Sequence, residues 1–366
     1  MTCLSCSAVV NCLSLYSIVF HSETFKTGDA QTLEVKGRIV VELIESRVLR
    51  GNPLHDPATR ELFVYLPPSY DGDESRRFAV VYCLSGFTGR GQMLLNSQPF
   101  MPNLAERMDQ LIASGTVGEM IIVMPDCFTR LGGSQYINSM ATGRYEDYLV
   151  AEIVPFVDAR FRTRARPDGR AVMGKSSGGY GALVHAMRHP DTFGAAASHS
   201  GDCYFEYCYL PDFPKAVRAL AGDPQAFLEK FWREERKGKD DIATLNILAM
   251  SACYSPDPTV PLGFRLPFDL TTGKIHPAVW ARWLEHDPVR MAARYRDQLK
   301  SLRLLYLDAG TRDEFWLDMG ARTLCARLEE MQISFIHEEF DDGHFNISYR
   351  YDRSLAHISK AVSGKQ

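Results

Sequence analysis

The sequence predicts an α/β protein with a mostly parallel sheet of eight strands and helices on both of its faces. Short apolar runs alternate with helical patterns over most of the 366 residues, and this order builds such a sheet. Several runs, such as FAVVYCL at 78–84 and MIIVM at 120–124, are continuously apolar, as is typical of strands buried on both faces. The composition, 45% hydrophobic and 23% charged, excludes a disordered, collagen-like or coiled-coil chain.

The elements follow one another in a regular order after Gly37. Eight strands are predicted, at 38–44, 61–66, 78–84, 120–124, 171–173, 193–198, 302–307 and 333–338. Helical patterns are predicted at 101–113, 144–159, 177–189, 318–331 and 351–362. An alternation of this kind places helices on both faces of the sheet.

One stretch, residues 203–300, breaks the alternation. It contains several helical patterns and Pro-rich loops but no convincing strand. Because ligands bind at the carboxyl ends of the strands in open α/β sheets, we expect this insertion to form a mainly helical cap over those ends. The aromatic residues that open it are expected either to line a substrate pocket or to pack the cap onto the core: Tyr204, Phe205, Tyr207 and Tyr209. The predicted domain, with its cap, spans residues 37–366.

The first 36 residues are predicted to be a poorly ordered extension outside this domain. Residues 8–20 are apolar enough for the core of a signal peptide, but no Lys or Arg precedes them and no clear A-x-A cleavage site follows. The nine cysteines are odd in number and irregularly spaced, which favours reduced thiols over a disulfide framework. We therefore predict a cytoplasmic protein, with a signal peptide as the alternative. No stretch reaches the length of a membrane span.

The charge balance argues against nucleic acid as a partner. Lys and Arg number 41 against 45 Asp and Glu, a formal net charge of −4. Five arginines crowd residues 160–170, a run more typical of a solvated face than of an anion-binding surface. A homo-oligomer is compatible with the sequence.

The segment Gly174-Lys175-Ser176-Ser177-Gly178 is a G-x-S-x-G motif. A short apolar strand precedes it and a helical pattern follows, which is the strand–turn–helix context of a nucleophile elbow. The glycines permit a tight turn that lifts the Ser176 hydroxyl above the sheet. The helix N-terminus below it favours developing negative charge.

The same residues also match a phosphate-binding loop, because residues 169–176 read GRAVMGKS. Such a loop needs its strand before the first glycine. Here the preceding residues are polar and include a proline, and the apolar residues fall inside the would-be loop. The NTPase interpretation is therefore the weaker one.

Candidates for a base and an acid follow the late strands. His344, in the loop DDGHF at 341–345, follows the last predicted strand and is placed to act as a general base. His199 ends an earlier strand and is its main rival. Asp313, in the loop after 302–307, is the candidate acid, and Glu314 is the alternative.

Two further features complete the search for chemistry. A glycine-bearing loop, SGFTG at 85–89, follows a buried strand and can aim a backbone N–H at a developing oxyanion, together with the N–H of Ser177. His185 and His189 lie one helical turn apart, but no third ligand accompanies them, so no metal site is predicted.

The motifs together resemble the Putative esterase family, related to esterase D and enterochelin esterase. The resemblance rests on FAVVYCLSGFTG, on the stretch from GGSQYINSMATGRYEDYL to DARFRT, on GKSSGG and on DGHFNISYRY, and covers residues 38–200 and 300–350. It implies an α/β-hydrolase fold and no cofactor. By motif, it implies a triad of Ser176, Asp313 and His344, with oxyanion N–H groups from Phe87 and Ser177.

The resemblance has departures. Many relatives have His where this chain has Ser85 and Met where it has Ser177, although a backbone donor survives both changes. The family includes S-formylglutathione hydrolases, feruloyl esterases and mycolyltransferases. The expected function is therefore a serine esterase acting on a small-molecule ester or thioester. An acyltransferase with the same triad, a P-loop NTPase and a non-catalytic binding module are the alternatives.

Overall fold

The computed structural model describes residues 36–363, and these belong to one compact unit that begins at Lys36. The N-terminal extension, with its signal-peptide-like run, and the cysteines at positions 3, 6 and 12 lie outside the described residues. The six described cysteines are all buried free thiols. No helix within the described range is long and apolar enough to cross a membrane.

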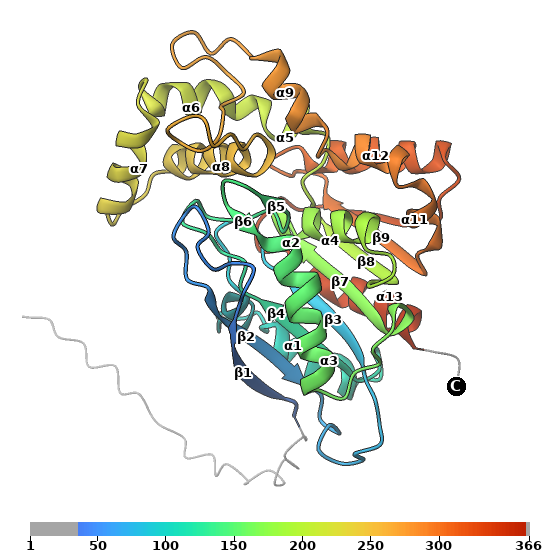
Figure 1. Cartoon of the computed structure of the whole chain (residues 1–366). Coiled ribbons are helices and arrows are strands. Elements are labelled where there is room, and N and C mark those ends of the chain that lie inside the picture. The colour runs from blue at the N-terminus through green and yellow to red at the C-terminus, as the bar shows by residue number, and fades with distance from the viewer. Residues whose placement is uncertain (1–35, 364–366) are drawn as a thin grey trace, which may run out of the picture. The chain divides into compact units, whose positions relative to one another are not determined.

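The sheet has the eight strands that the sequence predicts (Figure 1). Their bounds are β1 Arg38–Glu45, β2 Thr59–Leu66, β3 Ala79–Leu84, β4 Met120–Pro125, β7 Arg170–Lys175, β8 Ala195–His199, β9 Leu304–Gly310 and β10 Ile336–Phe340. They lie side by side in the order β1-β2-β4-β3-β7-β8-β9-β10. β1 pairs antiparallel with β2, and β2 antiparallel with β4, while all later pairs are parallel. The mixed, mostly parallel sheet confirms the predicted fold class.

Each face of the sheet carries its own apolar core, because successive strand residues point to opposite sides. On one face, Val81 and Met173 pack with residues of α1 Leu104–Ala113 and α13 Tyr351–Val362. On the other, Val80 and Val172 pack with α3 Val154–Arg160, α4 Ser177–Arg188 and α12 Leu317–Glu330. Helices on both faces were expected from the alternation of the sequence.

Two helices differ from the prediction: one begins later in the chain, and the other is interrupted. The helix predicted from residue 101 begins at Leu104, because Asn103 caps it by accepting the N–H of Glu106 in a capping box. The helix predicted at 144–159 is interrupted: a π-helical stretch at 148–153 separates α2 Tyr145–Asp147 from α3. The period of the apolar residues does not reveal such a local change of winding.

Residues 203–301 are helical, with short bridges and no strand of the main sheet. They contain α5 Phe205–Cys208, α6 Phe213–Leu220, α7 Pro224–Arg233, α8 Lys239–Tyr254, α9 Pro277–Leu284, α10 Pro288–Arg294 and α11 Arg296–Ser301. Figure 1 shows α6 to α9 gathered beyond one end of the sheet. The hydroxyl groups of Tyr209 and Tyr254 lie within 3.2 Å of the side chain of Gln135, and Tyr209 also contacts Asp202, just after β8. This segment therefore contacts the edge formed by the carboxyl ends of the strands.

The run of arginines at 160–170 is mostly paired with carboxylates. Arg160 pairs with Glu42 and Arg166 with Asp168. Arg170 is buried and pairs with Asp158, so it does not belong to a solvated face as the run predicted.

Candidate active site

Ser176 occupies a strained turn between β7 and α4. Its backbone has φ 58° and ψ −127°, a conformation that side-chain-bearing residues rarely adopt. The flanking glycines are required by space: a Cβ on Gly174 would lie 2.5 Å from the backbone of Gly178, and one on Gly178 would lie 2.1 Å from the oxygen of Leu84. The N–H of Ser176 donates to the oxygen of His199 at 2.9 Å, which ties the turn to β8. This is the geometry of a nucleophile elbow.

The same residues do not form a phosphate-binding loop. Arg170–Lys175, the centre of the GRAVMGKS match, is a strand paired on both sides in the sheet. Its backbone N–H groups are therefore engaged in the ladder and cannot cradle a phosphate.

The loop after β3 runs directly past the elbow. A Cβ on Gly86 would lie 3.4 Å from the Cβ of Ser176. The ring of Phe87 packs against Gly132, and the N–H of Thr88 donates to the oxygen of that glycine at 2.8 Å, which holds the loop in place. No hydrogen bond within residues 36–363 engages the N–H of Phe87 or of Ser177. Both N–H groups are thus available to a ligand near Ser176.

His344 and Asp313 meet as a buried pair. The Nδ1 of His344 lies 2.8 Å from Oδ2 of Asp313, and a carboxylate can only accept, so Nδ1 carries the proton. Asp313 Oδ1 accepts the N–H of Phe315 at 2.9 Å. Burial alone would raise the pKa of Asp313, but its interaction with His344 and its other hydrogen bonds, including that from the N–H of Phe315, outweigh burial and hold that pKa below its ordinary value.

Glu314, the alternative acid, has a different position. Its carboxylate accepts the backbone N–H of His344 at 2.6 Å and lies against Gly343, where a Cβ would come within 2.9 Å of it. Glu314 therefore holds the loop that carries His344 and does not contact the imidazole through a hydrogen bond.

The structure does not join all of the predicted residues. His344 and Asp313 are hydrogen-bonded, whereas no hydrogen bond links Ser176 with Nε2 of His344 within the described residues. Ser176 is half-buried and His344 is buried. Both follow strands of the sheet at their carboxyl ends, Ser176 after β7 and His344 after β10.

Comparison with known proteins defines the family. Residues 57–349 match the family model described as Putative esterase. The chain belongs to this family. The match spans well over half of the sequence, and it confirms the resemblance and the hydrolase class predicted from the motifs.

Curated relatives match parts of this esterase-family chain. Esterase Rv1288 of Mycobacterium tuberculosis is 43% identical over 83 residues, which are 22% of this chain and 18% of the relative. An endo-1,4-beta-xylanase/feruloyl esterase of Xylanibacter ruminicola is 31% identical over 160 residues, 43% of this chain and 21% of the relative. The chain thus spans about a fifth of the length of either relative.

A solved structure supports the fold of the esterase-family chain over most of its length. A ferulic acid esterase has a TM-score of 0.59 and 19% identity, and the likeness covers 89% of this chain and 99% of that one.

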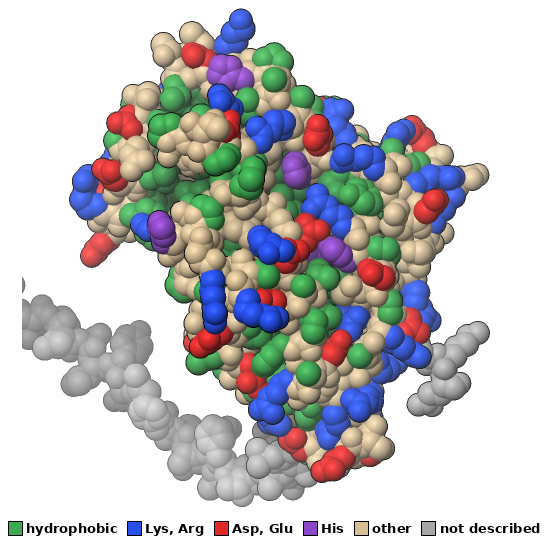
Figure 2. Space-filling model, in the orientation of Figure 1, with side chains coloured by type: hydrophobic (Ala, Val, Ile, Leu, Met, Phe, Trp, Pro, Cys, Tyr) green, Lys and Arg blue, Asp and Glu red, His purple; other side chains and the backbone are tan. Residues whose placement is uncertain are grey.

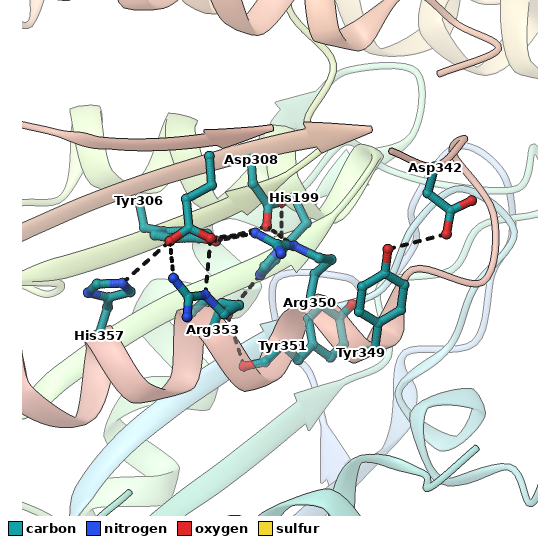
Figure 3. A network of polar contacts seen from close by, with 11 residues as sticks. His199, Tyr306, Asp308, Asp342, Tyr349, Arg350, Tyr351, Arg353 and His357 are labelled. Atoms are coloured by element: carbon teal, nitrogen blue, oxygen red, sulfur yellow. Dashed lines mark hydrogen bonds and ion pairs between the residues drawn. The ribbon is translucent and has the colours of Figure 1, made fainter. Parts of the chain in front are cut away.

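His199, the rival base, lies in a buried polar network of the esterase-family chain (Figure 3). Its Nδ1 lies 2.7 Å from Asp308, and its Nε2 lies 2.8 Å from the hydroxyl of Ser354 in α13. Asp308 also accepts from Arg350 and Tyr306. His199, Asp308 and Ser354 are at most 1% exposed, so no substrate reaches this histidine.

The pair His185 and His189 has a packing role. The two rings stack at 5.4 Å, His185 lies 3.0 Å from the oxygen of Tyr136, and His189 lies 2.8 Å from Glu146. Among residues 36–363, no cluster of His, Cys, Asp and Glu has the composition of a metal site.

The aromatic residues that open the cap divide into two kinds. Phe205 and Tyr209 are buried and pack with Tyr254, so neither ring offers a surface to a substrate. Tyr204 and Tyr207 contact each other edge to face at 4.6 Å, and Tyr207 is exposed. The expectation of a substrate wall survives only for the second pair.

One cavity lies inside the cap, and Ser176 does not line it. It has a volume of about 650 Å³ and mostly apolar walls, including Leu262, Phe264, Phe268 and Val279. Figure 2 shows hydrophobic side chains gathered on this part of the surface.

Two polar residues near the elbow were not predicted from the sequence. Asp202 and Gln135 are buried, and they are hydrogen-bonded to each other at 3.0 Å. Asp202 also lies 3.4 Å from the hydroxyl of Ser177. Gln135 lies in the GGSQY stretch that carries the family resemblance and Asp202 in SHSGD, but neither string assigns them a role, and only the fold brings them together.

Proposed function

We propose that the protein is a serine esterase that hydrolyses a carboxylic ester or thioester of a small molecule. The observation that carries the proposal is the conformation of Ser176, a strained elbow at the end of β7 with two unengaged N–H groups beside it. The buried His344–Asp313 pair follows later strands at the same edge of the sheet, and the order Ser, Asp, His along the chain is that of α/β-hydrolases.

In this mechanism, the Oγ of Ser176 forms a bond with the carbonyl carbon while its proton moves to Nε2 of His344. Asp313 holds the imidazole in the required tautomer and stabilises the imidazolium. The N–H groups of Phe87 and Ser177 stabilise the oxyanion. The carbon–oxygen bond to the leaving group then breaks, and His344 returns the proton to the leaving alcohol.

The acyl-enzyme is cleared by water. His344 takes a proton from the water as its oxygen attacks the acyl carbon, and the proton then passes to Oγ of Ser176, which releases the acid. We further propose that the cap at 203–300 limits the size of the acyl or leaving group. The names of the relatives, which include feruloyl esterases, support esters of small carboxylic acids.

The nucleophile is tested with a fluorophosphonate probe and Ser176→Ala. The probe is expected to label the peptide that contains Ser176, and the substitution should abolish labelling and lower ester turnover by about 10⁴- to 10⁶-fold. Ser177→Ala keeps its N–H and should still be labelled at Ser176. Labelling at another serine, or full turnover by Ser176→Ala, would contradict the proposal.

The substrate is tested with p-nitrophenyl esters of increasing chain length, together with S-formylglutathione and a feruloyl ester. Adding alcohols and analysing the products separates hydrolysis from acyl transfer, because a transferase would form the new ester.

A further inference from the structure

A cluster of buried polar side chains lies beside the elbow, and the mechanism above does not use it. Asp202, Gln135, Tyr209 and Tyr254 form it, and all four are at most 6% exposed. Tyr209 and Tyr254 come from the cap, Gln135 from the loop after β4, and Asp202 from the loop after β8. Three distant parts of the chain, around residues 135, 202–209 and 254, therefore place polar groups at one point.

All hydrogen bonds of the Asp202 carboxylate are made by one of its two oxygens. Its Oδ2 accepts from Nε2 of Gln135 at 3.0 Å and from the hydroxyl of Tyr209 at 2.9 Å, and it lies 3.4 Å from the hydroxyl of Ser177. Its Oδ1 accepts no hydrogen bond from the described residues. A carboxylate offers about four acceptor positions, so half of this group is unused.

Gln135 is also incompletely used. Its amide orientation is determined by its neighbours, because Nε2 lies 3.0 Å from a carboxylate oxygen and 2.8 Å from the hydroxyl of Tyr254. The other amide atom, Oε1, is buried and has no partner within residues 36–363. The cluster thus contains two unused acceptors, but Gln135 is 0% exposed and Asp202 is 6% exposed, so only Oδ1 of Asp202 is open to a ligand.

Asp287, in the same cap, shows how a purely structural buried aspartate differs. Its Oδ1 accepts the N–H groups of Tyr204 and Val289, and its Oδ2 accepts the N–H of Phe205, each at 3.0 Å. Burial raises the pKa of both Asp287 and Asp202, which reflects the free-energy cost of burying their charge. Only Asp287 offsets this cost at both oxygens.

The cluster lies next to the proposed nucleophile and the proposed oxyanion loop. Asp202 contacts Ser177, the residue directly after the proposed nucleophile. On the other side, the hydroxyl of Tyr136 donates to the oxygen of Ser85 at 2.6 Å and so connects the Gln135 segment to the proposed oxyanion loop. A group attached near the carbonyl carbon of a bound ester would lie close to these residues.

We propose that Asp202, held in place by Gln135 and Tyr209 through Oδ2, forms with its free Oδ1 an acyl-group subsite that binds a hydrogen-bond donor, a hydroxyl or an ammonium group, near the carbonyl carbon. The proposal rests on the proposed function, since it assigns the acyl side of the ester at Ser176. It predicts that substituted acyl groups such as hydroxyacyl or aminoacyl are preferred over the unsubstituted chains. A buried acceptor left without a donor costs free energy, and a site of this kind rejects the analogue that lacks the donor.

The test compares three methyl esters that differ in one group: methyl propionate, methyl lactate and alanine methyl ester. Hydrolysis at pH 7 is measured by the amount of acid released. Each kcat/KM is divided by the rate constant for uncatalysed hydrolysis of the same ester at the same pH, where the alanine ester carries the same ammonium group, which removes differences in chemical reactivity. The wild-type protein should favour lactate or alanine over propionate by about 10- to 100-fold, the range expected for a hydrogen bond to a charged group. Preference for lactate indicates a neutral donor, and preference for alanine indicates a cation.

Asp202→Asn is the decisive variant. The donors of Gln135 and Tyr209 require an acceptor at Oδ2, so the amide oxygen should take that place and the NH₂ group should replace Oδ1. The substitution thus turns the free acceptor into a donor at nearly constant volume. The preference should disappear, while hydrolysis of methyl propionate and labelling of Ser176 continue.

Asp287→Asn is the matched control, since it also alters a buried aspartate of the cap. It should lower the melting temperature and keep the acyl preference. Equal normalised rates for the three esters in the wild type, or loss of preference in both variants alike, would overturn the subsite. If the wild type neither hydrolyses methyl propionate nor reacts with a fluorophosphonate, the proposed function itself fails. The wild-type comparison remains decisive even if Asp202→Asn does not fold.

Discussion

Residues 36–363 contain two buried His–Asp pairs of nearly identical geometry. His344 and Asp313 are 2.8 Å apart, and His199 and Asp308 are 2.7 Å apart, each through Nδ1. The second pair even continues to a serine, because Nε2 of His199 lies 2.8 Å from the hydroxyl of Ser354. By hydrogen bonds alone, the second set is the more complete Ser–His–Asp arrangement.

The two pairs differ in the solvent access of the nearby serine and in the N–H groups beside it. Ser354 lies inside helix α13, where no strained turn or unengaged N–H group accompanies its hydroxyl, and it is fully buried. Ser176 is half-buried at a strained elbow next to the N–H groups of Phe87 and Ser177. A nucleophile requires access and a stabilised oxyanion as well as a base, so the hydrogen-bonded relay is not sufficient.

Replacing His344 or His199 by asparagine gives the largest expected difference in kcat between the two pairs. Asn can still donate to the aspartate, but it lacks an equivalent of Nε2. His344→Asn should therefore lower kcat by about 10⁴- to 10⁶-fold with little change in melting temperature. His199→Asn should lower the melting temperature and keep kcat per folded molecule. Ester turnover, thermal unfolding and active-site titration measure the two effects, and loss of turnover in a folded His199→Asn protein would reverse the assignment.

The aspartates extend the same comparison. Asp313→Asn should cost roughly 10⁴ in kcat, because an amide at this position favours the wrong imidazole tautomer. Asp308→Asn removes the charge that Arg350 Nε approaches at 2.9 Å in the buried network, so it should lower the free energy of unfolding by about 3 kcal/mol. Steady-state kinetics and urea unfolding separate the two results.

Glu314→Gln is the control for the acid. Gln retains an oxygen that can accept the N–H of His344, so its effect on kcat should be mild. A loss as large as that of Asp313→Asn would move the acid role to Glu314.

The strands and the elbow could be predicted because their signals are local. Continuous apolar runs indicate buried strands, and the glycines at 174 and 178 are required by close backbone contacts. The sequence could not show that His199 is buried and therefore not a catalytic base, because its burial depends on α13. Its partner in that helix, Ser354, lies 155 residues further along the chain. Asp202 and Gln135 were missed for the same reason: 67 residues separate them, and no motif assigned either of them a role. The sequence also did not show which aromatic residues of the cap would be buried.

Ser354→Ala gives the smallest effect and the sharpest test of the buried relay. The substitution removes only the hydroxyl that lies 2.8 Å from Nε2 of His199, and leaves that nitrogen buried without a partner. Such an unsatisfied group costs about 1–3 kcal/mol, so the midpoint of urea unfolding should fall. The slope of the free energy of unfolding against urea concentration should stay the same. Ester turnover and fluorophosphonate labelling should match the wild type, because Ser354 is reached by neither substrate nor probe. If Ser354→Ala instead lowered turnover as much as Ser176→Ala while remaining folded, the buried set would be part of the active machinery, and exposure would not be what distinguishes the two pairs.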